Sequence, residues 1–445
     1  MKKIFTLFFT ISFGLSAMAQ LITATGNMSV QRVGHESQLL SNGKVLVFGG
    51  NNGNFTGYTV HSSAQLYSGG SWATTGSMMK ARSEPGSALL TNGNVLVIGG
   101  EDLNSNSLKS CEIYNVTSGM WSYTDSMANA RSETRAVILN SGKILAVGGS
   151  SGGTCELYDQ TSSTWSVTGS MKVARSAGFA ATKLPNGDVL VTGGQSDTAE
   201  IYNVTSGTWN KVSNLMTLSR NYCTAILMTN GKILIAGGTS TFTSEVYDPS
   251  ANTFTATGNL GQYRVADEMI NLTNGKVLIY GIGTFAADRL ALEVFNPATN
   301  SWYYAGTVSS AIFTASDYTV HKLPGGSILY SGGNWTTGNG ANKECYLVNE
   351  SAIAAGIAEA LNLSFFEVYP NPVHDNFEIK MEIDGAVNIT IELKNMLGQT
   401  IKIIEKGKVS GSYHKAEDIS DLNSGIYILH VITGNANAAI KLVKE

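Results

Sequence analysis

Charge, proline and cysteine are all scarce in this 445-residue chain, and each scarcity excludes a class of protein. Only 14% of the residues are charged, and a net charge of −4 without a basic cluster argues against nucleic acid as a partner. The 43% hydrophobic content excludes a disordered chain, and four cysteines are too few for a disulfide framework. Forty-nine glycines between short apolar runs indicate an all-β protein built from many short strands and tight turns.

Long hydrophobic runs are missing as well, except at the amino terminus. Two lysines precede the apolar run 4–15, and a triplet of small and medium residues, Ala17-Met18-Ala19, follows it. This pattern is typical of a secretory signal peptide, and the run is too short to span a membrane permanently. We therefore predict a signal peptide over 1–19 and a mature chain that leaves the cytoplasm with no membrane-spanning segment.

One motif recurs seven times through the middle of the chain. Each copy has a turn dipeptide, an apolar strand and a Gly-Gly doublet, as in Asn42-Gly43, 45–48 and Gly49-Gly50. Such dipeptides suit two-residue hairpins because both central positions need a positive φ. A Glu-apolar-aromatic strand and a second aromatic strand follow in most copies, so each unit predicts four antiparallel strands. The doublets begin at Gly49, Gly99, Gly148, Gly193, Gly237 and Gly332, and Gly281 holds the equivalent place.

These units resemble the kelch repeat, in which a Gly-Gly doublet follows the second strand and a spaced Tyr and Trp come after it. The resemblance covers about 21–349 and implies a seven-bladed kelch-type β-propeller, which we place at 20–349. Radial stacking of the units would bury both faces of each sheet. The seventh unit lacks its last strand, while 23–28 copies 74–78. We therefore predict that the amino-terminal strand completes the last blade and covers its open edge.

The repeat stops after residue 349, and an Ala-rich stretch, 350–365, is predicted to be a linker. The segment 366–445 has more charge and alternating strands, and it resembles the C-terminal (Por) sorting domain of type IX secretion cargo, a small Ig-like β-sandwich. The resemblance implies passage through Sec to the periplasm, recognition by the type IX secretion translocon, and delivery to the medium or the outer cell surface. The matching residues are Tyr369, Pro370, Asn371, Pro372, Gly398, Gly425, Tyr427 and Lys441.

Motifs for metals and for nucleophilic catalysis are absent. Cys111, Cys155 and Cys345 occupy one slot in three units. Equivalent slots on neighbouring blades lie about 10 Å or more apart, beyond the ~7 Å between Cα atoms that a disulfide allows. We therefore predict free buried thiols. Some secreted kelch propellers resemble galactose oxidase, whose copper site needs two histidines, two tyrosines and a cysteine. Three scattered histidines in the propeller argue against that site, so we expect no metal and no other cofactor.

An arginine enters the first strand of six units, and two interpretations compete. Six cations at a channel mouth could gather an anionic ligand. Alternatively, the arginines cap carbonyl groups or pair with the repeated glutamates, which is favoured because they recur with the scaffold itself. These residues are Arg32, Arg82, Arg131, Arg175, Arg220 and Arg264.

Residues that differ between units are better candidates for a specific function. One set follows the repeated arginines near the expected channel mouth and comprises His35, Glu84, Glu133, Arg135, Tyr222, Asp267 and Glu268. A second set lies on the loops after the doublets, which are long in units six, seven, one and two. Its aromatic and basic members suit sugar stacking or peptide binding, although loops also vary in length without consequence. This set comprises Phe55, Tyr58, His61, Phe285, Arg289 and Trp335.

The sequence thus predicts a secreted or cell-surface propeller that binds an extracellular glycan or protein. The alternative is a carbohydrate-active enzyme of the mutarotase or lyase type, with its site at the channel mouth, as implied by the resemblance to other bacterial kelch propellers. The lack of a recognisable catalytic motif favours binding over catalysis. The fold alone does not choose the ligand.

Overall fold

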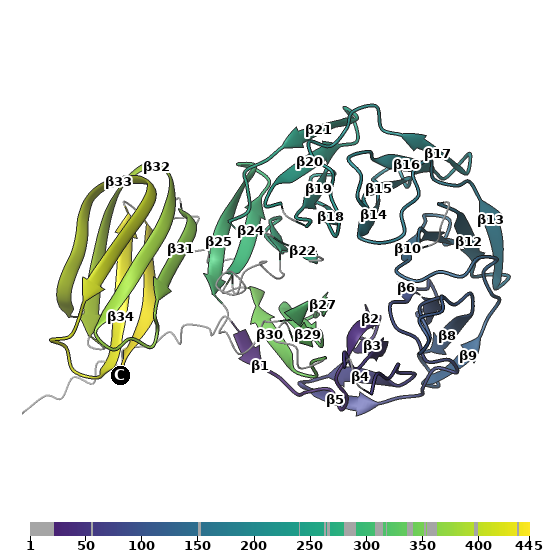
Figure 1. The fold of residues 1–445 in the computed structure, drawn as a ribbon, viewed down its shortest axis with the longest axis horizontal. Helices are drawn as coiled ribbons and strands as arrows, with labels where there is room; N and C mark the ends of the chain where they lie inside the picture. Colours follow the sequence, from purple (N-terminus) through teal and green to yellow (C-terminus); the bar gives the residue numbers. More distant parts are fainter. Residues whose placement is uncertain are drawn as a thin grey trace, which may run out of the picture.

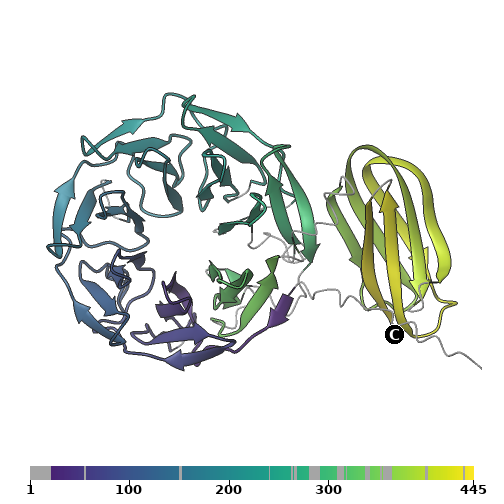
Figure 2. The same cartoon turned by 180° about the vertical axis from the view of Figure 1, so that it is seen from behind.

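The computed structural model describes residues 22–54, 57–149, 153–239, 241–261, 264, 268–279, 291–307, 315–316, 318–335, 341–350, 353, 363–395, 399–433 and 436–445. Seven four-stranded antiparallel sheets form a ring, and a further β-domain lies beside it (Figures 1 and 2). This arrangement confirms the predicted seven-bladed propeller. The predicted signal peptide and most of the predicted linker lie outside the described residues.

Each blade runs outward from the ring axis in chain order (Figure 1). Blade one comprises β2 (Val33–Leu39), β3 (Val45–Asn51), β4 (Ala64–Ser68) and β5 (Ser71–Thr74). Blade two comprises β6 (Gly86–Leu89), β7 (Val95–Ile98), β8 (Cys111–Asn115) and β9 (Met120–Tyr123). Blade three comprises β10 (Arg135–Ile138), β11 (Ile144–Val147), β12 (Cys155–Asp159) and β13 (Thr164–Thr168). Blade four comprises β14 (Phe179–Lys183), β15 (Val189–Gly193), β16 (Glu200–Asn203) and β17 (Thr208–Lys211). Blade five comprises β18 (Thr224–Leu227), β19 (Ile233–Ala236), β20 (Ser244–Asp248) and β21 (Thr253–Ala256). Blade six comprises β22 (Met269–Asn271), β23 (Val277–Ile279), β24 (Ala291–Asn296) and β25 (Ser301–Thr307).

Blade seven closes the ring with strands from both ends of the propeller. It contains β27 (Thr319–Lys322), β28 (Ser327–Ser331) and β30 (Cys345–Asn349), with a short pair, β26 (Ala315–Ser316) and β29 (Asn334–Trp335), beside it. The amino-terminal strand β1 (Ile22–Ala24) pairs antiparallel with β30, so that Ile22 lies opposite Val348 and Ala24 opposite Tyr346. This register confirms the predicted closure and leaves no unpaired outer edge on β30.

The second strands form the most deeply buried part of each blade. β3, β7, β11 and β19 each contain four consecutive apolar residues with no solvent exposure. Both faces of these strands pack against a sheet, because each blade lies between two neighbours. This double burial explains why their sequences are continuously apolar and do not alternate.

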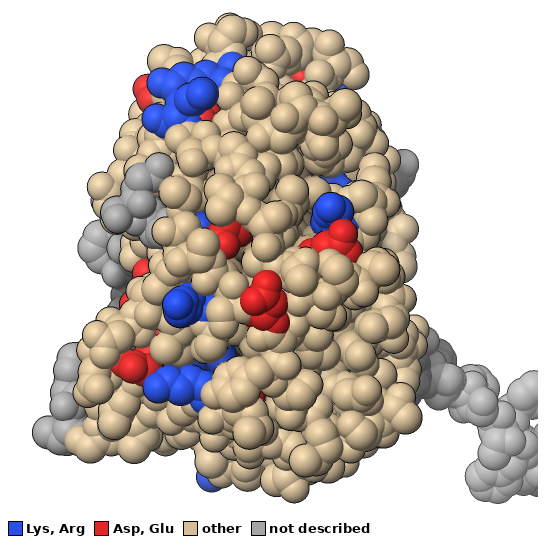
Figure 3. All heavy atoms as spheres, turned by 90° about the vertical axis from the view of Figure 1, so that its right-hand side faces the viewer, with Lys and Arg blue, Asp and Glu red and all other residues tan. Residues whose placement is uncertain are grey.

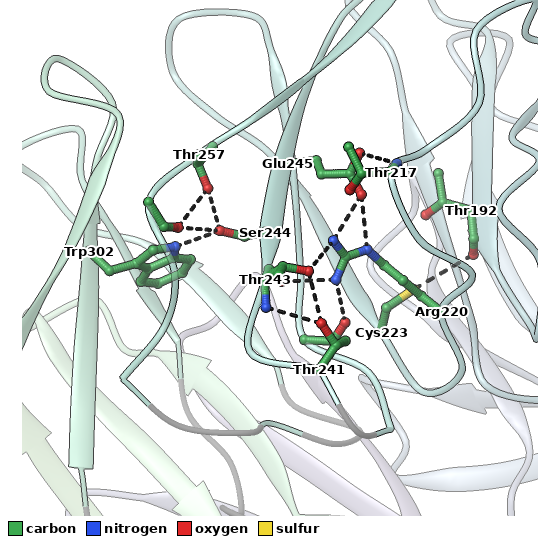
Figure 4. Close-up of polar contacts among 12 residues, drawn as sticks. Thr192, Thr217, Arg220, Cys223, Thr241, Thr243, Ser244, Glu245, Thr257 and Trp302 are labelled. Carbon is green, nitrogen blue, oxygen red and sulfur yellow. Dashed lines mark hydrogen bonds and ion pairs between the residues drawn. The ribbon is translucent and has the colours of Figure 1, made fainter.

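The repeated arginines are all fully buried, with a relative exposure of 0%. In blade five, the Arg220 Nη2 lies 2.8 Å from Glu245 Oε1, and its Nη1 donates to the Gly237 carbonyl at 2.8 Å (Figure 4). The same carboxylate accepts a hydrogen bond from the Thr217 amide. The structural role is therefore confirmed, and the buried guanidinium groups cannot gather a ligand from solution. The equivalent pairs are Arg82–Glu112, Arg131–Glu156, Arg175–Glu200 and Arg264–Glu293.

Blade one departs from this pattern because Gln65 stands where blades two to six have glutamate. Gln65 still accepts a hydrogen bond from the Ser29 amide at 3.0 Å. Arg32 donates to the Gly49 carbonyl and to the Ser63 hydroxyl, both at 2.6 Å. Burial lowers the pKa of Arg32 to about 10. Arg32 is thus a buried cation held by neutral oxygen atoms.

All four cysteines are free and buried, which confirms the prediction for the three repeated ones. Burial raises the pKa of Cys111 and of Cys345 to about 12, and that of Cys155 to about 11. Their thiolate forms are therefore scarce at neutral pH, and these thiols act as small apolar core residues.

The C-terminal β-domain contains five strands: β31 (Leu363–Tyr369), β32 (Asn376–Asn395), β33 (Thr400–Asp418), β34 (Gly425–Thr433) and β35 (Ala436–Lys444). The long strand β32 pairs with β33 along one edge. Along its other edge it pairs first with β31 and then with β34, which in turn pairs with β35. Alternate residues of β32, such as Phe377, Ile379 and Met381, are buried. The predicted alternating strands therefore have one face on a hydrophobic core, which is continuous with buried residues of blades six and seven.

Charged side chains are sparse on the side of the molecule drawn in Figure 3, where small groups of both signs lie on a mostly uncharged surface. This side offers no extended basic area. Within the described part of the chain, no helix is long and apolar enough to span a membrane.

Candidate functional site at the ring axis

The first strands of neighbouring blades contact one another around the ring axis, from β27 through β2, β6, β10, β14 and β18 to β22. Each first strand has one residue that pairs with the residue just before the Gly-Gly doublet of the second strand. In blade one this residue is Glu36, which lies opposite Phe48, and in blade three it is Arg135, which lies opposite Val147. Glu268 holds this position one residue before β22. The blades have different residues at this position, which in chain order are Glu36, Gly86, Arg135, Ala180, Thr224, Glu268 and Thr319. Charge is therefore confined to blades one, three and six, and we call Glu36, Arg135 and Glu268 the axial cluster.

Glu36 is held between blades one and two by a short hydrogen-bonded chain. Its Oε2 accepts from the Ser87 hydroxyl at 2.7 Å, and the Ser87 oxygen accepts from Gln38 Nε2 at 2.8 Å. Burial raises the pKa of Glu36 to about 7, although the bond from Ser87 and the charge of Arg135 act in the opposite direction. Its carboxyl group is thus fixed in place while it exchanges a proton near neutral pH.

Arg135 is exposed and is directed toward blade four. Its Nε donates to the Phe179 carbonyl at 3.2 Å, and its guanidinium carbon lies 5.8 Å from the centre of the Phe179 ring. The guanidinium group keeps further donors for other partners, because a single N–H satisfies the Phe179 carbonyl.

Glu268 keeps contact with water. Partial desolvation by the surrounding protein, followed by repulsion from Glu36, raises the pKa of Glu268 to about 7, whereas Arg135 lowers it. Because Glu36 and Glu268 interact, their protons are lost in coupled steps. The axial cluster therefore offers two carboxyl groups that both donate and accept hydrogen bonds at neutral pH, together with one permanent cation.

The raised pKa of Glu36 predicts a pH-dependent stability. Between its unfolded pKa of about 4.3 and the folded value of about 7, the folded protein holds the proton more tightly than the unfolded chain, so stability falls as the pH rises through this range. Glu36→Gln keeps the acceptor for Ser87 and removes the charge. We expect it to raise the melting temperature at pH 8 and to leave it unchanged at pH 4. An equal shift at both pH values would contradict this assignment.

The structure places the other candidates of the first set in different surroundings. Glu84 and Glu133 are partly exposed and precede the first strands of blades two and three, and Tyr222 is 38% exposed before that of blade five. His35 is 5% exposed, and its Nε2 lies 3.3 Å from the Thr319 hydroxyl of blade seven. Burial, then the charge of Arg32, lowers the pKa of His35 to about 3. His35 is therefore a neutral residue that is buried between blades one and seven.

The loop candidates are placed only in part. Tyr58 is 37% exposed, and His61 is partly buried with its Nε2 3.1 Å from the Gln31 carbonyl. The backbone of Trp335 pairs with Ala315. Four candidates lie outside the described residues: Phe55, Asp267, Phe285 and Arg289.

Glu36 is the residue that sequence reasoning missed. It directly follows His35, and Glu36 alone precedes its doublet by the same spacing as Arg135 in blade three and Glu268 in blade six. The alternation of side chains along β2 would have separated them, because His35 and Glu36 must face opposite neighbouring blades. His35 contacts blade seven and Glu36 contacts blade two.

The predicted sorting residues gather at one end of the C-terminal β-domain. The Val443 amide donates to Asn371 Oδ1 at 2.9 Å, and the Val373 amide donates to the Val443 carbonyl at 2.8 Å. The Tyr369 hydroxyl donates to Glu378 Oε2 at 2.6 Å. The segment that contains Tyr369 through Pro372 is thereby joined to the last strand.

The remaining residues of this set lie on the neighbouring strands. Gly425 begins β34 opposite Lys444, and Lys441 lies opposite Ile428 in β35. The Tyr427 hydroxyl donates to the Asn423 carbonyl at 2.9 Å. Gly398 lies outside the described residues.

Comparisons with known proteins identify the C-terminal domain and show the fold of the chain. Residues 367–445 match the family model of the Secretion system C-terminal sorting domain. No curated protein matches the chain. A solved structure described as a novel fungal alcohol oxidase of the AA5 family, in complex with copper, is similar in fold with a TM-score of 0.62 and 15% sequence identity, over 96% of this chain and 100% of that one. At this identity the likeness shows the β-propeller fold alone. The sorting domain shows that the protein is exported by type IX secretion to the cell surface or the extracellular space.

Proposed function

We propose that the protein is a kelch-type propeller that binds an extracellular glycan or protein at the axial end of its ring. In this proposal a signal peptide, 1–19, directs it through Sec, the propeller occupies 20–349, and a linker, 350–365, joins it to the sorting domain over 366–445. The observation that carries the proposal is the axial cluster, because three of seven equivalent positions hold a charge and the other four hold small residues.

The axial cluster is a stronger candidate than the long loops for a physical reason. A ring of similar blades acquires specificity where the copies differ, and a binding group must be held in a fixed orientation. Glu36 is held by Ser87, and Arg135 is held by Phe179. Tyr58 on the first long loop is exposed, and it stays a secondary candidate for a more distant part of the ligand.

A carbohydrate-active enzyme is the second candidate function, and the carboxyl groups of the axial cluster favour it. Glu36 and Glu268, each with a pKa of about 7, could exchange roles as general acid and general base near neutral pH. Arg135 could hold a ring oxygen or a carboxylate of the sugar between them. Reducing-sugar release and anomeric exchange should therefore be assayed beside binding.

Copper chemistry like that of the similar alcohol oxidase does not fit the residues of this chain that are described. The histidine Nε2 atoms already meet protein groups: that of His35 lies near Thr319, that of His321 lies 2.6 Å from the Ser37 hydroxyl, and that of His61 lies near a carbonyl. Burial lowers the pKa of His321 to about 4. Across the described ranges, no three or more His, Cys, Asp or Glu side chains converge as metal ligands.

A binding screen with two groups of variants tests the proposed function. The secreted protein is screened against glycans and surface proteins, and Glu36→Gln and Arg135→Met are then compared with Tyr58→Ala and Trp335→Ala. We expect each axial variant to weaken binding at least about tenfold, which corresponds to ~1.4 kcal/mol. The loop variants should change it less. Loss of binding in both loop variants, with normal binding in both axial variants, would move the site to the long loops.

A further inference from the structure

The histidines of the propeller all lie at the junction between blades one and seven, where the chain closes the ring. Two of them, His35 and His321, are on the first strands β2 and β27, which lie side by side (Figure 1). The third, His61, precedes β4, and its Nε2 lies 3.1 Å from the Gln31 carbonyl, in the segment that joins β1 to β2. The sequence has no histidine in blades two to six.

The two histidines of the first strands connect these blades by polar contacts. The His35 Nε2 lies 3.3 Å from the Thr319 hydroxyl, and the His321 Nε2 lies 2.6 Å from the Ser37 hydroxyl. A Cβ atom on Gly332, in the doublet of blade seven, would overlap the His35 ring. The imidazole of His35 therefore fills the space between the blades, and a charge on it would lack water around it.

The charged groups that act on His35 are all cationic. They are Arg32 and His61, and both disfavour a proton on His35. Blades two to six pair a buried arginine with a glutamate, whereas Gln65 and Tyr346 hold the glutamate position in blades one and seven. The junction therefore lacks the carboxylate that balances a buried cation elsewhere in the ring.

The carboxylates nearest along the chain have other partners. Glu36 is on the opposite face of β2 and accepts a hydrogen bond from Ser87 of blade two. Glu350 lies 2.9 Å from the Nζ atom of Lys322, and Glu344 accepts a hydrogen bond from a tyrosine of blade seven. Among the described residues, no carboxylate contributes to the pKa of any of the three histidines.

The closed junction keeps its histidines neutral. Burial, then the charge of Arg32, lowers the pKa of His35 to about 3, although the Ser331 backbone acts in the opposite direction. Desolvation by the surrounding protein lowers the pKa of His321 to about 4, and burial also lowers that of His61. A histidine released from the junction regains a pKa of about 6.5. Below that pH, protons bind the separated blades more tightly than the closed junction, so separation becomes easier as the pH falls.

We propose that the junction between blades one and seven is an acid-sensitive seam, at which the ring loosens before the other described blades separate. Opening requires β2 to leave β27, and the three-residue strand β1 to leave β30. Because β2 also carries Glu36, an open seam moves one member of the axial cluster away from the other two. The inference does not depend on what the axial cluster binds.

Hydrogen exchange of the full secreted protein at pH 7.5 and pH 5.0, corrected for the intrinsic exchange rate, tests the seam. We expect protection in β1, β2, β27 and β30 to fall at least about tenfold at pH 5.0, because each histidine changes the opening equilibrium by about tenfold per pH unit below 6.5. Protection in β11, β15 and β19, which belong to blades three to five, should change by less than about threefold.

Two variants separate the histidines from other effects of acid. His321→Gln keeps a hydrogen-bond donor for Ser37 and cannot gain a proton, so we expect it to reduce the acid-induced loss of protection at least about tenfold. His374→Gln is the control, because the His374 side chain is 80% exposed in the C-terminal β-domain. Glu36 changes stability in the opposite direction over this pH range, but it is present in every protein compared, so its contribution cancels.

Three outcomes would overturn the inference. They are unchanged protection of the four seam strands at pH 5.0, an equal loss in all blades, and a response of His321→Gln that equals that of His374→Gln. If His321→Gln does not fold, the exchange pattern of the unchanged protein decides alone: a loss confined to blades one and seven supports the seam, and any other pattern contradicts it.

Discussion

Deleting 366–445 is expected to abolish secretion and to leave a folded propeller in the periplasm. The deleted part contains the matched sorting domain and none of the strands of the seven blades, so the propeller loses no blade. The hydrogen bond between Asn371 and the Val443 amide joins the first motif of the domain to its last strand. Fractionation of cells, with immunodetection of the propeller in periplasm and medium, measures the effect.

The control for the truncation is a full-length variant with a change at the propeller surface, such as Lys143→Gln. It should reach the medium at the normal level. Truncated protein in the medium at that same level would show that the C-terminal β-domain is not the export signal. Rapid degradation of the truncated chain is distinguished by a melting curve of the purified propeller.

Glu156→Gln is expected to cost about 3–5 kcal/mol of unfolding free energy, because it leaves the buried Arg131 without its carboxylate. The Arg131 Nη2 lies 2.9 Å from Glu156 Oε1, and both side chains are at most 1% exposed. The same carboxylate also accepts hydrogen bonds from the amides of Ala128 and Asn129. Glutamine preserves the shape of the side chain, so the loss reports the missing charge together with the one acceptor that its NH2 group replaces.

Blade one supplies the reverse experiment. Gln65→Glu places a carboxylate beside Arg32, whose buried cation has neutral partners among the residues that the structure describes. We expect this change to raise stability by about 1–3 kcal/mol, in the range of hydrogen bonds to charged groups. Lys143→Gln, which removes an exposed ion pair with Asp159, should alter stability by less than about 1 kcal/mol. Urea denaturation of the three variants measures these differences, and a destabilised Gln65→Glu would contradict the account of the buried pairs.

Local patterns in the sequence were sufficient to predict the architecture of the propeller. The Asn-Gly dipeptides located the hairpins, but the predicted turn type was wrong: Gly43 has φ of +78°, whereas the φ of Asn42 is not positive. The Gly43 amide donates to the Leu40 carbonyl and the Leu40 amide donates to the Lys44 carbonyl, so the loop is longer than two residues. The copy of the strand-four pattern near residue 23 predicted that β1 would pair with β30. The equivalent slots of the cysteines predicted free thiols, because repeat geometry fixes their separation. All of these inferences need only one blade and its periodic repetition.

Tertiary structure alone decided the partners of the arginines and the composition of the site. The sequence left Arg220 with two interpretations, and only the folded blade brings it to Glu245, 25 residues away. The axial cluster joins residues of blades one, three and six, so its members converge only after the ring has closed. The left-handed backbone at Glu84, Glu133 and Tyr222, whose amides donate to carbonyl groups of the preceding blade, has no local signal either. Sequence periodicity determined the scaffold, and contacts between distant blades determined the site, since a charge acquires its environment only from neighbours that the fold assembles.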